Sequence, residues 1–599
     1  MRTPSYFLAA IRPRSHHRGA LESESVFSGR GPGDTVTSVQ CGGFDCCWLT
    51  SESTTVAASP RTRDVILVLH GELYADSGPT SAEACLEAYM KNEMGFLAEL
   101  HGSFVLGVID RSLGRVFFAT DPVNSRMLFF GELDGIAWIS TMHAFHLHPC
   151  SGKPDPAGLA HCLVNGVPMN GRTPFDGVRV LDRASIHEIQ GIGVKSESYW
   201  RYWPQPRIDR SESAFKTDLR DILLTAVKRR LPSGGEVVLS LSGGYDSTAI
   251  LGAFGHLGVP DVHCFTYRKP SESVHRSDAS VARKMAAIAG YAHTEIEAYG
   301  DDVATVIGEN VRWGHGLTRL VVETDTWRTL RGLLPADGQT TLWVADECFG
   351  MNPPRKLENR ADVLNSLAFA HWSSLGPLKG LFPRSVASLL DDALRDDLKA
   401  MLERNRAIQD PYVLRDYLYL DQRLPRLLSW REAFAEPCGG VRNPLIDREI
   451  LELRQRFPKH LTLGKCLYKD TVEEMFPELF ATDRADAGAW FAGEWCREVV
   501  RTQSDDLARM IRTNPSPLDP YLPPDALLRV IEREASRAGM LRRLTRRART
   551  TKGRVWKRIR TIGRPNPPAL RPQQPAVDPA VFVLRAITLR ELFRQRATG

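Results

Sequence analysis

An apolar run that stops abruptly at small residues limits the fold of this chain more than any other feature. Residues 236–241 read EVVLSL, residues 242–247 read SGGYDS, and helical spacing follows. A parallel strand that enters a helix through glycines presents backbone N–H groups and the positive end of the helix dipole to an anion. The run lacks the Lys of a GxxxxGK[ST] loop and the third glycine of a dinucleotide fingerprint, which disfavours both of those folds.

Strand and helix patterns alternate around this loop. Helical spacing at 214–230 precedes the apolar strand, and two further strand patterns at 262–267 and 293–299 enclose a helical pattern at 277–290. Such alternation predicts a doubly wound parallel sheet with crossover helices. Beyond about residue 350 the pattern is mainly helical. We therefore expect an α/β multidomain chain whose parallel sheet carries a helical C-terminal part.

The first 200 residues show a different pattern, made of short β-branched or aromatic runs bounded by Gly, Asp or Pro. These runs occupy 63–74, 102–110, 114–121 and 125–141, and apolar residues recur at helical spacing within 81–102. Runs of this kind predict antiparallel strands and hairpins. We expect the strands to pack against a helix layer in an α+β domain.

Length and composition fit a protein of several domains. The chain has 599 residues, a net charge of +6 and 43% apolar residues, enough for more than one core. We expect domains at 1–200 and 210–500, a linker at 199–213 and a helical basic extension at 501–599. No apolar run approaches the roughly 18 residues that a membrane span needs. The apolar stretch near the start of the chain is too short for a secretory signal. The eleven cysteines do not follow the spacing of a metal site or a disulfide framework. These features predict a cytoplasmic protein with reduced thiols.

The glycine loop resembles the SGGxDS loop of the PP-loop ATP pyrophosphatases. Those proteins bind the β,γ-phosphates of ATP and release pyrophosphate after adenylating an acid or a carbonyl. The resemblance implies ATP and Mg²⁺ as cofactors, and a carboxylate in such a loop can hold a cation that bridges phosphates. The implied ATP-binding residues are Ser240, Leu241, Ser242, Gly243, Gly244, Asp246, Ser247 and Tyr267. A plain Ser-Gly-Gly turn is the alternative reading.

A second acidic loop follows about one hundred residues later, in TLWVADECFGM at 341–351. It resembles the GEGxDExFGG loop of class B asparagine synthetases. The resemblance implies Asp346 as a second magnesium residue beside Glu347, with Thr341 and Leu342 on the nucleotide side of the strand. Trp343 stands where the family has Glu and two glycines are missing. A solvated acidic turn is the alternative here.

Two further segments resemble the same family, so that the resemblance covers about residues 60 to 480. NPLIDREILE at 443–452 is similar to its RxPFLDxxLVE segment, and 462–480 is similar to its GKxxLRxAxxxxLP segment. The family's RxK lysine is missing near Arg484, and Lys465 and Lys469 are the nearest substitutes, although either can be an ordinary surface lysine. The candidate catalytic residues are therefore Asp246, Asp346, Lys465 and Lys469, and the candidate metal ligands are Asp246 and Asp346.

The N-terminal strands carry strings that resemble the glutaminase domain of class II amidotransferases, which implies an Ntn-hydrolase-like sandwich. HGELYA at 70–75 and ATDPVNSRMLFF at 119–130 are the main matches. In that family the cysteine after the initiator Met attacks the glutamine amide, whereas this chain has Arg2. His70 replaces an oxyanion-hole Asn, and Ala82 falls where an Asp binds the substrate amine. We expect glutamine hydrolysis to be lost and the domain to persist as a scaffold.

A degenerate glutaminase domain implies that the attacking amine comes from elsewhere. Within the asparagine synthetase superfamily, β-lactam synthetases and lasso-peptide cyclases join two groups of one substrate, where proximity lowers the barrier. The chain looks most like a lasso-peptide cyclase, an ATP-dependent amide-forming ligase, which implies a small precursor peptide and its leader-peptide protease as partners. Asparagine synthesis from free ammonia, a tRNA-modifying PP-loop enzyme and a non-catalytic binding protein stay open as alternatives.

A basic segment at 537–564 contains no acidic residue. Such a run can attract nucleic acid, an acidic partner or an anionic membrane surface, or it can be a solvated stretch of chain. Nucleic acid is the less expected partner, because the β-rich N-terminal domain and the absence of paired CxxC motifs argue against a tRNA enzyme. The sequence leaves the oligomeric state open.

Overall fold

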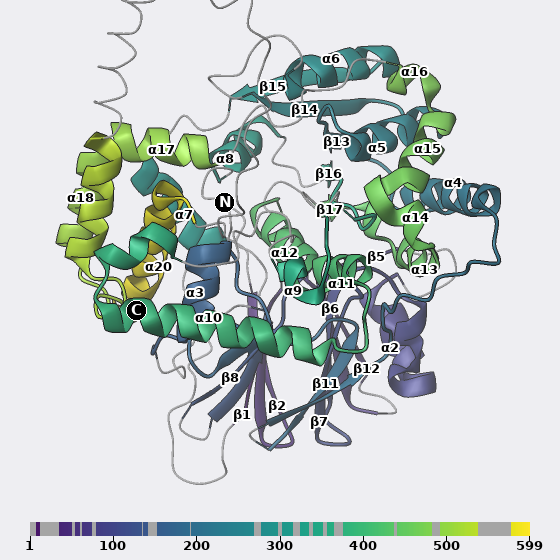
Figure 1. The fold of residues 1–599 in the computed structure, drawn as a ribbon. Helices are drawn as coiled ribbons and strands as arrows, with labels where there is room; N and C mark the ends of the chain where they lie inside the picture. Colours follow the sequence, from purple (N-terminus) through teal and green to yellow (C-terminus); the bar gives the residue numbers. More distant parts are fainter. Residues whose placement is uncertain are drawn as a thin grey trace, which may run out of the picture.

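The computed structural model describes most of the chain and shows three β-sheets (Figure 1). The described residues are 7–11, 35–50, 54–59, 63–74, 80–133, 136–141, 152–191, 193–268, 277–297, 302–314, 324–334, 340–350, 356–364, 375–435, 440–481, 492–536 and 577–598. Two sheets are antiparallel and lie in the N-terminal part, and the third is parallel. The predicted fold class is confirmed.

The two antiparallel sheets have six strands each. In the first the order is β10 (Val178–Val180), β8 (Phe129–Leu133), β9 (Ile136–Ser140), β1 (Phe7–Ile11), β3 (Phe44–Thr50) and β2 (Thr35–Cys41). In the second it is β12 (Gly193–Ser198), β11 (Ser185–Gln190), β7 (Arg115–Thr120), β6 (His101–Asp110), β5 (Val65–Tyr74) and β4 (Thr54–Ser59). The run expected at 125–141 forms the hairpin β8–β9 rather than one strand.

Alternation along the second sheet divides its side chains between two cores. Val68, Val105 and Phe118 face the first sheet and pack with its residues Trp48 and Ile139. The intervening residues face the helix layer formed by α2 (Ala82–Asn92) and η1 (Glu93–Glu99), and they include Leu67, Leu69, Leu106 and Val108. This period of two confirms the predicted arrangement of strands against helices.

The parallel sheet has the order β15, β14, β13, β16, β17. Their bounds are β13 (Val237–Ser240), β14 (Val262–Arg268), β15 (Ala292–Glu297), β16 (Thr341–Trp343) and β17 (Gly440–Arg442). All four strand pairs are parallel, so the carboxyl ends of the strands lie at one edge of the sheet. Strand β17 was not predicted, because a strand of three residues has no readable alternation.

Helices cover both faces of the parallel sheet. One face carries α4 (Glu212–Lys228), α5 (Tyr245–His256) and α6 (Asp278–Ala289), and the other meets α8 (Thr324–Leu333) and α12 (Leu424–Ala435). Figure 1 shows the parallel strands above the antiparallel ones, with α12 between the two regions. The remaining helices in this part are α7 (Val303–Gly314), α9 (Arg360–Leu364), η4 (Gly376–Leu381), α11 (Pro411–Leu418), η5 (Tyr419–Arg423), η7 (Pro444–Ile446), α13 (Arg448–Arg454), α14 (Lys459–Thr462), η8 (Leu463–Lys465), α15 (Cys466–Met475) and α16 (Pro477–Phe480).

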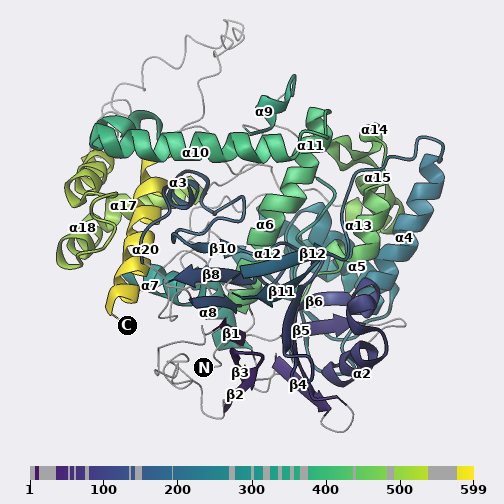
Figure 2. The same ribbon diagram turned by 90° about the horizontal axis from the view of Figure 1, so that it is seen from below.

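Helical segments complete the molecule on the side away from α4 (Figure 2). They are α3 (Pro156–Ala160), η2 (His161–Asn165), α10 (Arg384–Arg404), α17 (Ala492–Thr502), α18 (Ser504–Thr513) and α20 (Pro579–Thr598). The Arg585 side chain of α20 donates hydrogen bonds to the carbonyls of Leu163 and Val164, both at 3.0 Å. Helix α20 is thus docked onto the N-terminal part of the chain.

The expected linker at 199–213 is bound along much of its length. The backbone N–H groups of Gln205 and Arg207 donate to the carbonyls of Gln455 and Arg456, at 2.7 and 2.9 Å. The basic segment 537–564 lies outside the described residues. Within the part of the chain that the structure describes, no helix is both long and apolar enough to cross a membrane.

Candidate active site

The glycine loop lies at the carboxyl end of β13, in the middle of the parallel sheet. Leu241 continues the strand, because its N–H donates to the carbonyl of Phe265 at 2.9 Å and its carbonyl accepts from the Thr266 hydroxyl at 2.6 Å. The chain then turns through Ser242 and two glycines into α5, whose N-cap is Gly244. No side chain caps this helix, so its N-terminal end faces the loop without an internal acceptor.

Two serines hold the loop in shape. The Ser247 hydroxyl accepts a hydrogen bond from the N–H of Ser242 at 2.9 Å, and the Ser242 hydroxyl accepts one from the N–H of Gly244 at 3.2 Å. A Cβ added at Gly244 would lie 3.2 Å from the Ser242 hydroxyl, a tight contact. The loop is thus pre-organised, with its backbone available to a phosphate at a helix N-terminus.

The acidic loop follows β16, the neighbour of β13. Its chain is tied to β17, because Val344 N–H donates to the carbonyl of Arg442 at 3.1 Å and the Asn443 side-chain amide donates to the carbonyl of Asp346 at 2.9 Å. Trp343 is fully buried and packs edge-on against Phe254 of α5, with 4.8 Å between ring centroids. The tryptophan that replaces the family's Glu therefore lies in the core behind the sheet.

Lys465 joins the two loops. Its Nζ lies 3.4 Å from Oδ2 of Asp246 and 2.9 Å from Oε1 of Glu347. The residue sits immediately before α15 with φ 59°, a left-handed backbone that directs the chain into that helix. Lys469, one turn further, lies 5.3 Å from the centre of the Tyr245 ring instead. The structure brings Lys465 to the carboxylates and places Lys469 on an aromatic ring.

The charges of this cluster are only partly balanced. Burial raises the pKa of Asp246, although Lys465 pulls it back, and burial raises the pKa of Glu347 to about 7. Burial alone would lower the pKa of Lys465, but the attraction of Glu347 and Asp246 raises it. One ammonium group thus lies between the partly exposed Asp246 carboxylate and the buried Glu347 carboxylate, and a further cation is electrostatically favoured.

The geometry accommodates a divalent cation together with phosphates. The Asp246 carboxylate has Lys465 and the Tyr468 hydroxyl as neighbours, and Asp346 lies close enough to raise the pKa of Asp246. In the ranges that the structure covers, no three His, Cys, Asp or Glu side chains form a complete metal site. Magnesium held by one or two carboxylates plus substrate phosphates needs no such cage, so Asp246 and Asp346 suit that role.

Three functional residues were missed by the sequence analysis as active-site candidates. Glu347 was noted beside Asp346 but given no role, yet it contacts Lys465. Arg431 of α12 has its Nε 2.6 Å from Oδ2 of Asp346, and Asn443 holds the same residue through its backbone. The acidic DE pair was a usable signal for Glu347, whereas nothing in the helical pattern of α12 pointed to Arg431.

The nucleotide-side residues predicted on the strands lie at two levels of the sheet. Ser240 ends β13 level with Phe265 of β14, and Tyr267 lies two residues further along β14. Thr341 and Leu342 pair with Val237 and Val238 of β13. Both lie deeper in the sheet than the loops, so their contribution is to hold the strand that carries Asp346.

The positions that resemble a glutaminase centre make other contacts in this structure. Nε2 of His70 lies 3.0 Å from Nη1 of Arg126, and Ala82 is a fully buried first residue of α2. Cys41, the cysteine nearest the start of the chain, is buried and its thiol pKa is raised to about 11 by burial. Arg2 lies outside the described residues.

A cavity of about 30 Å³ lies where the two domains meet. Its wall includes Ser103 and Ser125 of the N-terminal domain and Arg431, Glu432 and Asn443 of the other. The space is sufficient for about one water molecule. Polar groups from both domains therefore converge next to the acidic loop.

The family model described as Asparagine synthase matches residues 218–552, more than half of the chain. The chain belongs to the asparagine synthase family. A second family model, Glutamine amidotransferase domain, matches residues 67–200. The family therefore accounts for the parallel-sheet region, and the amidotransferase likeness accounts for most of the antiparallel one.

Among curated proteins the chain is similar to two asparagine synthetases and one amidase. Asparagine synthetase [glutamine-hydrolyzing] 3 of Bacillus subtilis (strain 168) is 27% identical over 206 residues, which cover 33% of this chain and 32% of that protein. Asparagine synthetase [glutamine-hydrolyzing] 2 of the same organism is 26% identical, over 36% of this chain and 30% of its own length. Amidase chyE of Penicillium rubens is 24% identical, over 37% of each. The chain spans about a third of the length of the curated relatives it matches.

Among solved structures the likenesses are distant. Glutamine phosphoribosylpyrophosphate amidotransferase from B. subtilis matches with a TM-score of 0.22 and 13% identity, over 48% of this chain and 65% of that one. NMN synthetase from Francisella tularensis matches with a TM-score of 0.17 and 16% identity, over 24% of this chain and 57% of that one.

Proposed function

We propose that this member of the asparagine synthase family is an ATP-dependent carbon–nitrogen ligase that adenylates a carboxylate and passes the acyl group to an amine. The observation that carries the proposal is the meeting of the glycine loop, the acidic loop and Lys465 at the carboxyl edge of the parallel sheet. Ligands of open α/β sheets bind at that edge. Family membership supports the same reaction type.

In the first step the substrate carboxylate attacks the α-phosphorus of ATP, and the bond to the β-phosphate breaks to release pyrophosphate. The backbone of the glycine loop and the N-terminal end of α5 bind the phosphates. Lys465 is positioned to exchange its contacts with Asp246 and Glu347 for the negative charge that develops on the phosphates. Magnesium, held by Asp246 and Asp346, would supply charge neutralisation on the pyrophosphate oxygens when bound.

In the second step an amine attacks the acyl carbon and AMP leaves with one oxygen of the original carboxylate. The amine gives up a proton, and we propose Glu347, whose pKa burial raises to about 7, as the acceptor once Lys465 has moved to the phosphates. A base of that pKa serves well near neutral pH. The Trp343 ring does not block the space for the acyl substrate, because it lies in the core behind the sheet.

The second part of the proposal concerns the source of the amine. His70 is engaged by Arg126, Ala82 has no polar side chain, and Cys41 is buried with a raised pKa, so this part of the N-terminal domain offers no reactive thiolate. We infer that the substrate brings its own amine, as in macrolactam closure of a lasso-type precursor peptide. A peptide of this kind, delivered after leader removal by a protease, is the partner we propose, and the cytoplasm is the compartment we propose for the reaction.

The experiment for this proposal incubates the purified chain with Mg-ATP and a leader-free candidate precursor peptide that carries a free α-amine and an Asp or Glu side chain. The expected products are AMP, pyrophosphate and a peptide lighter by one water. An unchanged peptide mass alongside pyrophosphate release would keep the ligase and refute the cyclisation. Absence of both pyrophosphate and AMP with every acyl substrate would refute the ligase itself.

Asparagine synthesis from free ammonia is the second candidate function. The similarity to two proteins named asparagine synthetase favours it, and the same adenylation machinery would serve aspartate. Formation of asparagine from aspartate, Mg-ATP and ammonium chloride would support it. The same assay with glutamine in place of ammonium should give no asparagine, whichever of the two proposed functions is correct.

A further inference from the structure

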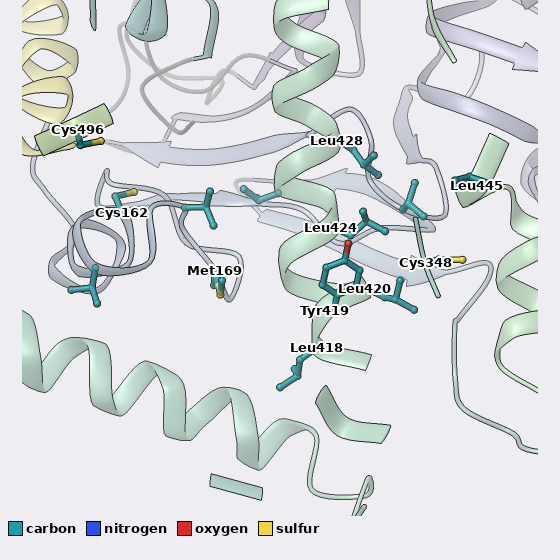
Figure 3. Close-up of a cluster of buried hydrophobic side chains, with 14 of the residues drawn as sticks. Cys162, Met169, Cys348, Leu418, Tyr419, Leu420, Leu424, Leu428, Leu445 and Cys496 are labelled. Atoms are coloured by element: carbon teal, nitrogen blue, oxygen red, sulfur yellow. The ribbon is translucent and has the colours of Figure 1, made fainter. Parts of the chain in front are cut away.

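Helix α12 lies between the two domains and touches both. Figure 3 shows Leu424 and Leu428 along one helix, with Met169 of the N-terminal domain on one side and Cys348 of the acidic loop on the other. These residues belong to one continuous hydrophobic cluster. The helix is therefore packed on both sides, so that a shift in its position would move side chains in both regions.

On its N-terminal-domain side, α12 is held through Glu432. Oε2 of Glu432 accepts a hydrogen bond from Nη2 of Arg126 at 3.0 Å, and Oε1 accepts one from the Ser103 hydroxyl at 2.9 Å. Arg126 and Glu432 are buried, with side-chain exposures of 7% and 9%. Both carboxylate oxygens thus have partners from the N-terminal domain, and charge-assisted bonds of this kind are geometrically demanding.

Behind Glu432 the contacts continue into the former glutaminase centre. Arg126 reaches His70 at 3.0 Å, the Ser103 and Ser125 hydroxyls lie 2.6 Å apart, and the Ser125 hydroxyl donates to Asp121 at 2.6 Å. The ion pair of Arg126 and Glu432 is therefore part of a larger hydrogen-bonded network. The network around His70 and Arg126 thus ends on α12.

On the other side, the residue before Glu432 holds the acidic loop. Arg431 forms an ion pair with Asp346, at 2.6 Å between Nε and Oδ2. Successive residues of an α-helix point about 100° apart, and both Arg431 and Glu432 line the same interdomain cavity. Only one peptide unit separates the contact with the N-terminal domain from the contact with Asp346.

We propose that Arg126 and Glu432 are positioning residues that set Asp346 through Arg431, so that the degenerate N-terminal domain acts as a brace for the acidic loop. This rests on the proposed function in so far as Asp346 serves the nucleotide. The brace explains a role for a domain whose glutaminase residues are replaced. A tie that merely joined the domains would stabilise the chain without affecting the order of the acidic loop.

The test compares Glu432→Gln, which removes the charge opposite Arg126, with Arg172→Met as a matched control. Arg172 also bridges the domains, but it pairs at 2.9 Å with Asp397 of α10 rather than with α12. Ser103→Ala serves as a milder second variant, since it deletes one hydrogen bond to Glu432 and keeps the ion pair. Thermal unfolding first establishes that each variant folds.

The first readout is hydrogen–deuterium exchange of the free protein in the peptide covering 341–350. We expect roughly tenfold faster exchange in Glu432→Gln, within the usual range of couplings between packed sites, a smaller increase in Ser103→Ala and no change in Arg172→Met. Equal exchange in Glu432→Gln and wild type would overturn the brace. This readout needs no nucleotide, so it fails or succeeds separately from the proposed function.

The second readout is the magnesium and ATP dependence of ATP–pyrophosphate exchange. For Glu432→Gln we expect the Mg²⁺ concentration at half-maximal rate to rise about tenfold, with Arg172→Met unchanged. A parallel loss of rate with an unaltered Mg²⁺ requirement would show a structural tie only and would overturn the proposal. A wild-type protein that never exchanges pyrophosphate would refute the proposed function, and the deuterium readout would then decide the brace alone.

Discussion

Two buried acidic clusters of this chain differ in how well their charges are balanced. Asp447, at the start of α13, lies within 3.3 Å of Arg229, Arg230 and His101. Burial alone would raise its pKa, but Arg230, His101 and Arg229 hold it well below the usual range. Asp246 and Glu347 instead share the ammonium group of Lys465 as an ion-pair partner, and both have a raised pKa.

The difference separates a carboxylate that stabilises the fold from carboxylates that await a ligand. In the Asp447 cluster two arginines lie against the carboxylate and depress its pKa, so the ionised form favours the folded state. In the Asp246 cluster the ionised form is disfavoured by burial and would be relieved by a bound cation. Substitutions should therefore affect stability in the first cluster and activity in the second.

The largest effect on activity is expected for Asp246→Asn. Pyrophosphate exchange should fall by at least about a thousandfold, because the phosphate-binding site loses a ligand and a partner of Lys465. The unfolding temperature should stay equal or rise, since the removed carboxylate has a raised pKa in the folded state. If the variant retained a tenth of the wild-type exchange rate, the proposed difference between the Asp246 and Asp447 clusters would be wrong.

The largest effect on stability is expected for Asp447→Asn, at about 3–5 kcal/mol of unfolding free energy at pH 7. The stabilisation by Asp447 is present above the unfolded pKa of about 3.9 and is lost as the pH falls, because the folded pKa is depressed. Urea unfolding at a series of pH values should show the difference between variant and wild type shrinking below about pH 4. A difference that grows in acid would contradict the assignment.

Lys465→Met should lower the exchange rate by about a hundred- to a thousandfold, the usual cost of removing one preorganised donor at a site of developing charge. The measurement is initial exchange rate at saturating Mg-ATP. Because both neighbouring carboxylates lose their cation, the variant should also bind Mn²⁺ more tightly in the absence of ATP, which electron paramagnetic resonance can quantify. Unchanged Mn²⁺ affinity would show that Lys465 does not compete for the site.

Lys469→Met provides the smallest effect and the matched control for Lys465→Met. Its ammonium group rests on the Tyr245 ring, a contact that contributes about 0.5–1 kcal/mol at an exposed site. The exchange rate should change by less than about threefold. A loss as large as that of Lys465→Met would reverse the roles given to the two lysines.

The sequence was sufficient for the elements with strong local patterns. The β-branched run at 63–74 and the apolar run before Ser242 both predicted strands that the structure contains as β5 and β13. The SGGYDS and ADE strings predicted two loops after strands, and parallel pairing of β13 with β16 makes their ends adjacent. Because neighbouring parallel strands end at the same edge of the sheet, two loops that are distant in the sequence form one site.

The sequence was not sufficient where the structure depends on contacts between remote segments. Glu432 and Arg126 are 306 residues apart, and a helical pattern does not tell which polar residue of α12 faces the other domain. The replacement of an Asn by His70 was read as a loss, while its contact with Arg126 became visible only in the fold. Trp343 was noted as a departure from the family's Glu, but only the structure shows that its ring packs behind the sheet.

The most direct test of the account follows the oxygen of the substrate carboxylate. The leader-free precursor peptide, or aspartate with ammonium as the second candidate, is labelled with ¹⁸O in its reacting carboxylate and incubated with Mg-ATP and the enzyme. The account predicts one ¹⁸O in the AMP released and none in pyrophosphate. Label in inorganic phosphate with formation of ADP would show an acyl-phosphate route and contradict adenylation at this site.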